Sequence, residues 1–483
     1  MTLVDAEVPR TELFIGGDWR TSSDGSTFDV FDPADGSVLA TVPNGTVEDA
    51  IACVDAAAGA APEWAATAPR ARGEILRRAF EMMVERADEI ATLIVRENGK
   101  PLADARSETV YAAEFFRWYS EEAVRILGSI STAPSGANRI MVIHQPVGIS
   151  VLVTPWNFPA AMATRKIGPA LAAGCTCILK PASDTPLTAL LMADILGEAG
   201  VPPGVINVLP SRRSGEVVAA MVDDPRVRKL SFTGSTEVGS GLLALAARTI
   251  VNTSMELGGN APFLVFADAN LDAAVEGAMI AKMRNIGEAC TAANRFYVEE
   301  PVAETFGAML AERMGSLKMG HGLDEGVQVG PLINEDARSK IDSLLSDAVD
   351  RGGSVLSGGG RVDGPGYFYQ PTVVGDVHAA SQILREEIFG PVAPIVTFSS
   401  EAEAIAMAND TEYGLVSYLY TRDLSRGLRV AEALEAGMIG LNRGLVSDPA
   451  APFGGVKQSG IGREGGHEGV LDYTESKYIA TEW

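Results

Sequence analysis

The chain has 483 residues, of which 39 are basic and 63 are acidic, so its formal net charge at neutral pH is −24. A chain this acidic repels nucleic acid and anionic membranes, and we expect neither as a partner. No apolar run reaches transmembrane length and the N-terminus lacks the pattern of a secretory signal, so we expect a cytoplasmic protein.

The length predicts two or three domains. Short antiparallel strands are expected up to residue 43, where apolar and polar residues alternate between turn signals. Helical spacing then runs from Thr46 to Asn98, with breaks predicted at Pro62 and Pro69, and a further helix is predicted over residues 104–127. The segment 138–159 reads as a pair of extended strands.

Between Val147 and Val265, short β-rich apolar runs alternate with alanine-rich helices, which is typical of βαβ units on a parallel sheet. Ligands of such sheets bind beyond the carboxyl ends of the strands, so we expect a dinucleotide site there. A second alternating region runs from Asp268 to Asn442. The C-terminal tail has the pattern of an edge strand that pairs with a partner subunit.

The cysteines and histidines do not have the spacing of a metal site, and we expect no bound metal. Cys175 and Cys177 lie in "AAGCTCILK", which predicts a buried strand, and belong to the core. Cys290 lies among small residues in "NIGEACTAANR". A free cysteine is most often a small buried hydrophobe, so Cys290 by itself does not establish a nucleophile.

Three further motifs are equally ambiguous when taken singly. In "KLSFTGSTEVG" a strand ends at Phe232 and glycines open a helix, which suits a phosphate, although the spacing is not that of the G-x-G-x-x-G fingerprint. Glu256 in "MELGGN" is either a base with a raised pKa or a solvent-facing carboxylate. Asn157 in "TPWNFP" is either an oxyanion donor or a buried turn residue.

The motifs become decisive in combination. The blocks "TPWNFP", "KPAS", "FTGSTEVG", "MELGGN", "GEACTAANR", "EEIFGPV" and "PFGGVKQSGIGREGG" follow one another in this order. From about Phe14 to its C-terminus the chain therefore resembles the NAD(P)-dependent aldehyde dehydrogenase superfamily. The resemblance implies an α/β fold with a Rossmann-type cofactor domain (1–124 and 146–257), an α/β catalytic domain (258–460) and a β-strand oligomerisation arm (125–145 and 461–483) of a homodimer or homotetramer.

The same resemblance implies residue roles. Cys290 would attack the aldehyde to form a thiohemiacetal and then a thioester, Asn157 would hold the oxyanion, and Glu256 would activate the hydrolytic water. NADP is expected as cofactor, with NAD as the alternative, because relatives that prefer NAD often carry a glutamate at the position of Ser183. The implied cofactor-binding residues are Pro155, Trp156, Lys180, Ser183, Arg212, Arg213, Gly234, Ser235, Leu257, Glu387 and Phe389.

At three positions, Arg165, Arg284 and Ser447, the sequence resembles the pattern of succinate-semialdehyde dehydrogenases. The resemblance implies that these residues bind the distal carboxylate of the substrate. They predict the oxidation of succinic semialdehyde to succinate. The alternatives are a dehydrogenase for glutarate or 2-oxoglutarate semialdehyde, a general aldehyde dehydrogenase, or a structural ion pair for either arginine. An acylating dehydrogenase, a Cys–His hydrolase and a silent binding protein fit less well, because Glu256 is present and the matched blocks contain no histidine.

The chain departs from the family pattern at two positions near the nucleophile. Family members often have glutamine where this chain has Glu288, whose acid either raises the pKa of the thiol or points away from it. Several relatives have a second cysteine where this chain has Ala292, so no local disulfide switch is expected.

Overall fold

The computed structural model describes residues 10–482. Residues 1–9 and Trp483 lie outside the described residues. The start of the expected cofactor domain, and of the segment that lacks a secretory-signal pattern, therefore lies outside them as well. None of the helices within residues 10–482 combines the length and apolar character needed to cross a bilayer.

Among the described residues, the first sheet has eight strands in the order β2-β1-β9-β8-β7-β10-β11-β21. The strands β9, β8, β7, β10 and β11 are parallel, which confirms the predicted βαβ units. The strands are β1 (Leu13–Ile15), β2 (Asp18–Arg20), β7 (Ile149–Val153), β8 (Cys177–Lys180), β9 (Ile206–Val208), β10 (Val227–Thr233), β11 (Asn252–Glu256) and β21 (Gly460–Ile461). Their crossover helices are α5 (Pro159–Ala173), α6 (Pro186–Glu198), α7 (Ser214–Val222) and α8 (Thr236–Ala246).

Before this sheet, a hairpin of β3 (Thr27–Phe31) and β4 (Val38–Pro43) leads into four helices, α1 (Val47–Ala66), α2 (Pro69–Glu85), α3 (Ala87–Asn98) and α4 (Leu102–Glu122). The predicted break at Pro69 is confirmed, but the predicted break at Pro62 is wrong, because α1 continues to Ala66. Pro62 lies near the C-terminal end of α1, so it removes one helical hydrogen bond there, while Trp64 in the following turn is buried in the core.

Two buried glutamates fix the starts of α5 and α6. Each helix begins with a proline and leaves its first N–H groups without helical partners. Glu108 accepts from Ala160 N at 2.9 Å in α5, and Glu97 accepts from Leu187 N at 2.8 Å in α6. The loops that precede both helices carry "TPWNFP" and "KPAS", so this capping holds two of the matched blocks in place.

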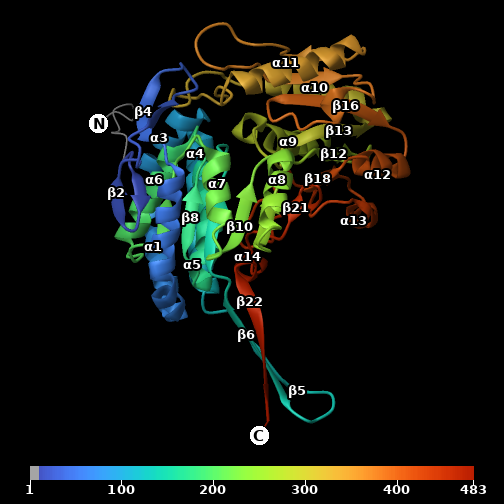
Figure 1. Ribbon diagram of the computed structural model, residues 1–483. Helices are drawn as coiled ribbons and strands as arrows, with labels where there is room; N and C mark the ends of the chain where they lie inside the picture. Colours follow the sequence, from blue (N-terminus) through green and yellow to red (C-terminus); the bar gives the residue numbers. More distant parts are fainter. Residues whose placement is uncertain (1–9, 483) are drawn as a thin grey trace.

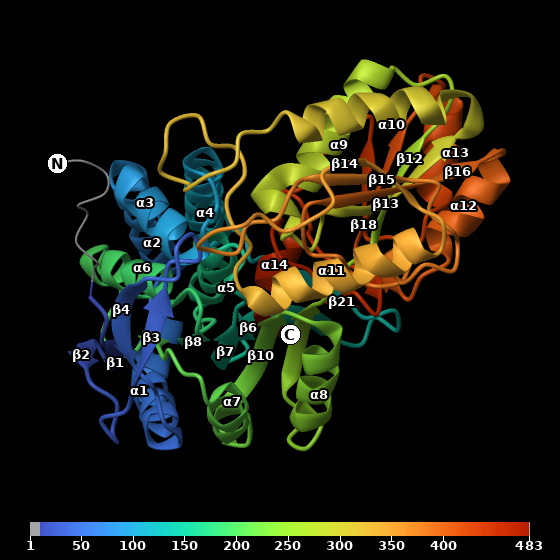
Figure 2. The same ribbon diagram turned by 90° about the horizontal axis from the view of Figure 1, so that it is seen from above.

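The second sheet has seven strands in the order β14-β15-β16-β13-β12-β18-β19 and lies beside the first (Figure 2). Its strands are β12 (Ala261–Val265), β13 (Ala293–Glu299), β14 (Ser354–Ser357), β15 (Thr372–Gly375), β16 (Val392–Phe398), β18 (Val416–Tyr420) and β19 (Met438–Leu441). Its helices are α9 (Leu271–Met283), α10 (Glu300–Gly315), α11 (Glu335–Asp350), α12 (Glu401–Asn409) and α13 (Leu424–Ala433). Short elements complete this part: the turns η2 (Arg284–Gly287) and η3 (Gln382–Leu384), and the pair β17 (Tyr413–Gly414) and β20 (Val456–Lys457).

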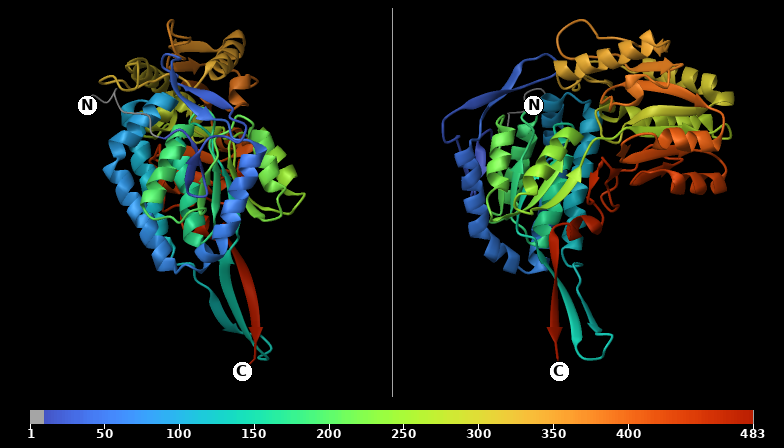
Figure 3. Two further views of the ribbon diagram at one scale, coloured as in Figure 1. Left: turned by 60° about the vertical axis from the view of Figure 1, so that its left-hand side comes forward. Right: turned by 45° about the vertical axis from the view of Figure 1, so that its right-hand side comes forward.

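A three-stranded antiparallel arm projects from the body, with the C-terminal end of the chain at its tip (Figures 1 and 3). It consists of β5 (Ser129–Thr132), β6 (Arg139–Pro146) and β22 (Thr474–Thr481), and β22 pairs with β6 along its whole length. Within the expected arm segment 461–483, β21 pairs with β11 and α14 (Glu468–Leu471) packs on α5, so the described arm strand begins only at Thr474.

Candidate active site

A cavity of about 550 Å³ lies beyond the carboxyl ends of β7, β8 and β10, where a parallel sheet binds its ligands. The structure brings together there most of the residues that the sequence indicates as functional. Those that line the cavity are Pro155, Trp156, Asn157, Lys180, Ser183, Gly234, Ser235, Leu257, Cys290, Glu387 and Phe389.

Cys290 lines this cavity and is half-buried, whereas the other three free cysteines are buried in the core. Burial raises the pKa of the Cys290 thiol to about 12, although Arg165 acts to lower it. The carboxyl group of Glu288 points away from the thiol, since its Oε1 accepts a hydrogen bond from Ile333 N at 3.1 Å. The resting thiol is therefore protonated at neutral pH and needs a base before it can attack.

Asn157 lies in the loop just before α5 and lines the same cavity as Cys290. Its Nδ2 donates to the backbone oxygen of Glu288 at 3.0 Å, which ties the oxyanion loop to the nucleophile loop. A carboxamide has two N–H groups, so one donor is still available to a substrate oxygen. The neighbouring Trp156 ring contacts Phe389 edge to face, at 5.4 Å between centroids, and closes one side of the cavity.

Glu256 ends β11 and lies behind the cavity, outside its lining residues. Its Oε2 is buried without a hydrogen-bond partner. Burial, followed by the nearby charge of Glu464, raises the pKa of Glu256 well above its usual range, against Arg165. A carboxyl group with a raised pKa is suited to act as a base once it is ionised.

Glu464 is a site residue that the sequence analysis did not single out, although it lies in the matched block "SGIGREGG". Its carboxylate forms buried ion pairs with Arg165 Nε at 2.5 Å and Lys166 Nζ at 2.5 Å. Burial raises its pKa, but Arg165 and Lys166 outweigh this and lower the pKa below its usual value. Glu464 is thus held as a carboxylate beside Glu256.

The three predicted substrate residues differ in their partners. Arg284 Nη1 lies 3.2 Å from Ser447 Oγ, and its guanidinium stands 4.8 Å above the ring of Phe158. Arg165, in contrast, is fully buried and paired with Glu464, which corresponds to the structural ion pair considered as an alternative. Both arginines are near Tyr111, whose pKa they act to lower against the effect of burial.

At the other end of the cavity, burial lowers the pKa of Lys180 to about 8, and Asp184 is the charged neighbour that opposes this shift. Asp184 lines the cavity next to Ser183 and was missed by the sequence analysis, because nothing in its motif distinguished it from a helix-capping aspartate. Its pKa is raised by burial, against Arg212 and Lys180.

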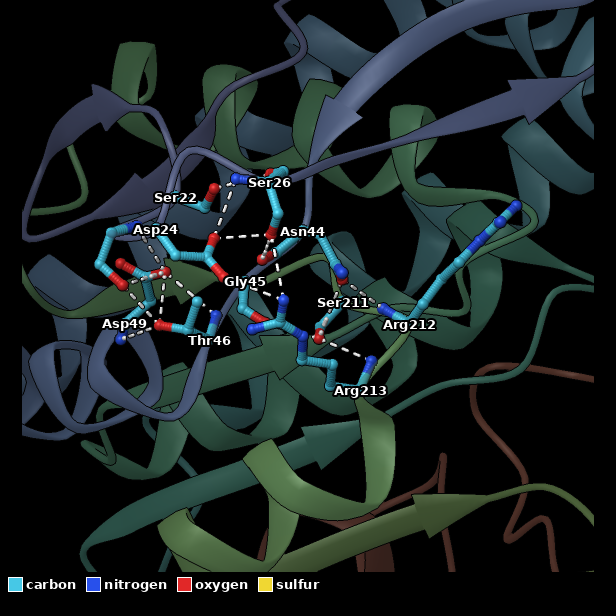
Figure 4. Close-up of polar contacts among 11 residues, drawn as sticks. Ser22, Asp24, Ser26, Asn44, Gly45, Thr46, Asp49, Ser211, Arg212 and Arg213 are labelled. Carbon is cyan, nitrogen blue, oxygen red and sulfur yellow. Dashed lines mark hydrogen bonds and ion pairs between the residues drawn. The ribbon is translucent and has the colours of Figure 1, made fainter.

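Arg212 and Arg213 were predicted to bind the cofactor and are not among the residues that line the cavity, although the charge of Arg212 acts on the pKa of the lining residue Asp184. The Arg213 side chain extends toward the turn that precedes β3, where its Nη2 pairs with Asp24 Oδ2 at 2.9 Å (Figure 4). Arg212 points in another direction, and its Nη2 donates to Asp29 O in β3 at 3.1 Å. The two side chains thus join the segment after β9 to β3 and the turn before it, a contact between segments too distant in sequence for a local motif to reveal.

Other lining residues were also missed, since they come from helix faces outside the matched blocks: Ser214, Gly215, Val218, Leu242, Ala337 and Lys340. The cavity fits a dinucleotide. Ser235 caps the N-terminus of α8 by accepting from Val238 N, and a Cβ on Gly234 would stand 2.4 Å from the Phe232 ring, so only glycine lets the chain pack this closely at the helix start. No group of three or more His, Cys, Asp or Glu side chains within residues 10–482 is arranged to hold a metal.

Comparison with known proteins agrees with this geometry. The model of the aldehyde dehydrogenase family matches residues 19–479. The chain is 58% identical to a succinate-semialdehyde dehydrogenase of Paenarthrobacter nicotinovorans over 92% of this chain and 98% of that protein. It is 49% identical to a glutarate-semialdehyde dehydrogenase of Pseudomonas putida over 99% of each.

Among solved structures, that of an NADP dependent enzyme from E. coli superposes with a TM-score of 0.97 at 48% identity, and the match covers 98% of both chains. This similarity confirms the expected α/β fold class over the whole described chain. The chain belongs to the aldehyde dehydrogenase family.

Proposed function

We propose that this chain oxidises succinic semialdehyde to succinate with NADP, through a thiohemiacetal and then a thioester on Cys290. The observation that carries the proposal is one continuous cavity that joins Lys180 and Ser183 to Cys290, with the Arg284–Ser447 contact close to the thiol. The succinate-semialdehyde dehydrogenase relative supports this substrate, and the similar NADP dependent enzyme from E. coli supports this cofactor.

In the first half of the reaction, the Cys290 thiol releases its proton to water, and the resulting thiolate bonds to the aldehyde carbon while the carbonyl oxygen takes up negative charge. The free N–H of the Asn157 carboxamide and the backbone N–H of Cys290 hold that oxygen. When bound, the nicotinamide accepts the hydride that leaves the tetrahedral carbon. The carbonyl then re-forms as a thioester of Cys290.

In the second half, Glu256 removes a proton from the water that attacks the thioester. The carbon–sulfur bond breaks, the Cys290 thiolate leaves, and succinate is released. The Glu256 carboxyl group needs glycine at position 454, because a Cβ there would stand 2.8 Å from its Oε1. Because its pKa is raised, the ionised carboxylate of Glu256 is a stronger base than an ordinary glutamate.

At the far end of the substrate, Arg284 and Ser447 bind the carboxylate. Arg165 contributes its positive charge, part of which Glu464 already neutralises. Arg284 and Ser447 could also bind the carboxylate of a substrate with a longer carbon chain. The glutarate-semialdehyde dehydrogenase relative favours glutarate semialdehyde as the second candidate substrate. The remaining alternatives are 2-oxoglutarate semialdehyde and an unselective aldehyde dehydrogenase.

Lys180 and Ser183 bind the adenine ribose and its 2′-phosphate, and Glu387 binds the nicotinamide ribose beside Phe389. Gly234 and Ser235 hold the pyrophosphate at the start of α8. Pro155, Trp156 and Leu257 form the walls of the cavity around the dinucleotide. NAD is the alternative cofactor.

The expected domain division is also part of the proposal, with the C-terminal strand of the arm beginning at Thr474. The exposed arm joins subunits into a homodimer or homotetramer, because edge strands pair readily between subunits. A cytoplasmic location is supported by four cysteines that are all free in residues 10–482.

The test is an assay of nicotinamide reduction by absorbance, with succinic semialdehyde, glutaric semialdehyde and butanal, each with NADP and with NAD. We expect the highest kcat/KM for succinic semialdehyde with NADP, and no turnover in Cys290→Ala, which should still bind NADP. Arg313→Ala is the control, because Arg313 forms an exposed ion pair with Glu276 and neither residue lines the cavity. Turnover by Cys290→Ala would refute the assignment of the nucleophile.

A further inference from the structure

The nucleophile loop begins with a left-handed turn. Asn285 and Ile286 both have φ of 50° and Gly287 has φ of 80°, three residues before Cys290. Glycine adopts this conformation freely and asparagine tolerates it, but a β-branched isoleucine does so only where its surroundings impose it. The turn must therefore be held by specific contacts.

Those contacts come from several parts of the chain. Asn285 is buried, and its backbone N–H donates to Asp104 Oδ2 at 2.9 Å. Gly287 packs directly against Gly390, since a Cβ on Gly287 would stand 2.2 Å from the oxygen of Gly390. The loop that carries Cys290 is thus fixed against α4 on one side and against the loop after Phe389 on the other.

The Asn285 carboxamide bridges the two loops of the reaction centre. Its Nδ2 donates to Asn157 O at 3.0 Å and to Glu288 O at 2.9 Å. Glu288 O is also the acceptor of the Asn157 side chain, so one carbonyl receives both carboxamides. The second acceptor, Asn157 O, is also bound by Lys100 Nζ at 2.7 Å, and Lys100 is itself paired with buried Glu108.

We propose that Asn285 is a positioning residue for the oxyanion site of this enzyme. It touches neither substrate nor cofactor and acts through Asn157 and the backbone of the Cys290 loop. Two N–H groups on one nitrogen match the two carbonyl oxygens, and asparagine also accepts the left-handed backbone, so the position demands both properties at once. The inference rests on the proposed function, because it concerns the same oxyanion.

Two variants separate the carboxamide from the backbone. Asn285→Gly keeps the left-handed turn, which glycine adopts without strain, and deletes the bridge. Asn285→Asp keeps the shape and replaces both donors with oxygen opposite two carbonyl oxygens. Asn442→Gly is the matched control, because Asn442 also has a positive φ, of 54°, but its carboxamide bonds Thr421.

Three quantities are measured for each protein: the single-turnover rate of NADPH formation, the rate of Cys290 alkylation by iodoacetamide, and the midpoint of thermal unfolding. We expect the single-turnover rate to fall by about tenfold or more in both Asn285 variants, toward the 10²- to 10³-fold that loss of one oxyanion donor costs. Alkylation requires the thiol but no oxyanion site, so it should keep the wild-type rate. Asn442→Gly should keep both rates.

A double-mutant cycle with Asn157→Ala completes the test. If Asn285 acts through Asn157, adding Asn285→Gly to Asn157→Ala should cost little further rate. An unchanged single-turnover rate, full additivity, or a parallel loss of single-turnover rate, alkylation and thermal midpoint would each overturn the proposal. A wild-type protein that forms no NADPH would refute the proposed function itself, an outcome separate from any ratio between variant and wild type.

Discussion

Arg284 Nη1 lies 3.2 Å from Ser447 Oγ, while the Arg284 guanidinium stands over the rings of Phe158 and Tyr111. The Arg284 cation thus lies between two aromatic rings, with a hydroxyl group as its hydrogen-bond partner, and its charge acts on the thiol of Cys290. By comparison, the cation of Arg165 is already matched by the carboxylate of Glu464. The two arginines therefore lead to different predictions.

Butanal has nearly the shape of succinic semialdehyde without the carboxylate, and it should be a poor substrate. A cation left without its partner in a site that the substrate closes off from water costs about 2–5 kcal/mol, or about 30- to 3000-fold in kcat/KM. Arg284→Ala should bring the kcat/KM values of the two aldehydes close together, because it lowers kcat/KM for succinic semialdehyde and leaves that for butanal nearly unchanged. Comparable wild-type rates for the two aldehydes would show that Arg284 and Ser447 do not bind the carboxylate.

Arg165→Ala should affect stability as well as substrate choice. It leaves Glu464 buried with Lys166 as its remaining partner, and breaking a buried pair by removing one member costs about 3–5 kcal/mol. Denaturant unfolding of Arg165→Ala should show this loss of unfolding free energy, whereas Arg284→Ala should unfold like the wild type. Equal stabilities of the two variants would mean that the Arg165–Glu464 pair contributes little.

Glu256→Gln should separate the two halves of the reaction. Glutamine cannot take the proton of the hydrolytic water, so the thioester should accumulate after one hydride has left. We expect a burst of about one NADPH per active site followed by slow turnover, measured by stopped-flow absorbance. Loss of the burst would place Glu256 earlier in the mechanism, as the base that activates Cys290.

The rate of the burst should rise with pH. Burial raises the pKa of Cys290 to about 12, and the thiol reacts in its deprotonated form. This raised pKa places the deprotonation at higher pH, so the rate of the burst should grow between pH 6 and pH 9, by up to about tenfold per unit. A burst rate that falls over this range would contradict Cys290 as the nucleophile.

Cofactor choice should depend on two adjacent positions. Ser183→Glu adds a carboxylate that repels the 2′-phosphate of NADP and should shift preference toward NAD. Asp184 already brings a carboxylate into the same cavity, opposite Lys180, so Asp184→Asn should raise preference for NADP. The ratio of kcat/KM for the two cofactors measures both effects, and a shift toward NAD in Asp184→Asn would refute this role of Asp184.

The sequence by itself determined the family and the parallel βαβ order, and it predicted Cys290 as the nucleophile. Ordered blocks such as "GEACTAANR" report side chains whose chemistry is local, and strand–helix alternation follows from the period of apolar residues. Even so, Pro62 did not break α1, since burial of the neighbouring Trp64 outweighed one lost hydrogen bond.

Only the tertiary structure decided which charges are already paired. Arg165 and Glu464 are 299 positions apart along the chain, and Arg213 and Asp24 are 189 apart, so no local pattern could join them. It also revealed Asn285, whose carboxamide has a role only because the Asn157 and Cys290 loops meet beside it. A residue type states what a side chain can donate or accept, but the folded chain decides which partner stands within reach.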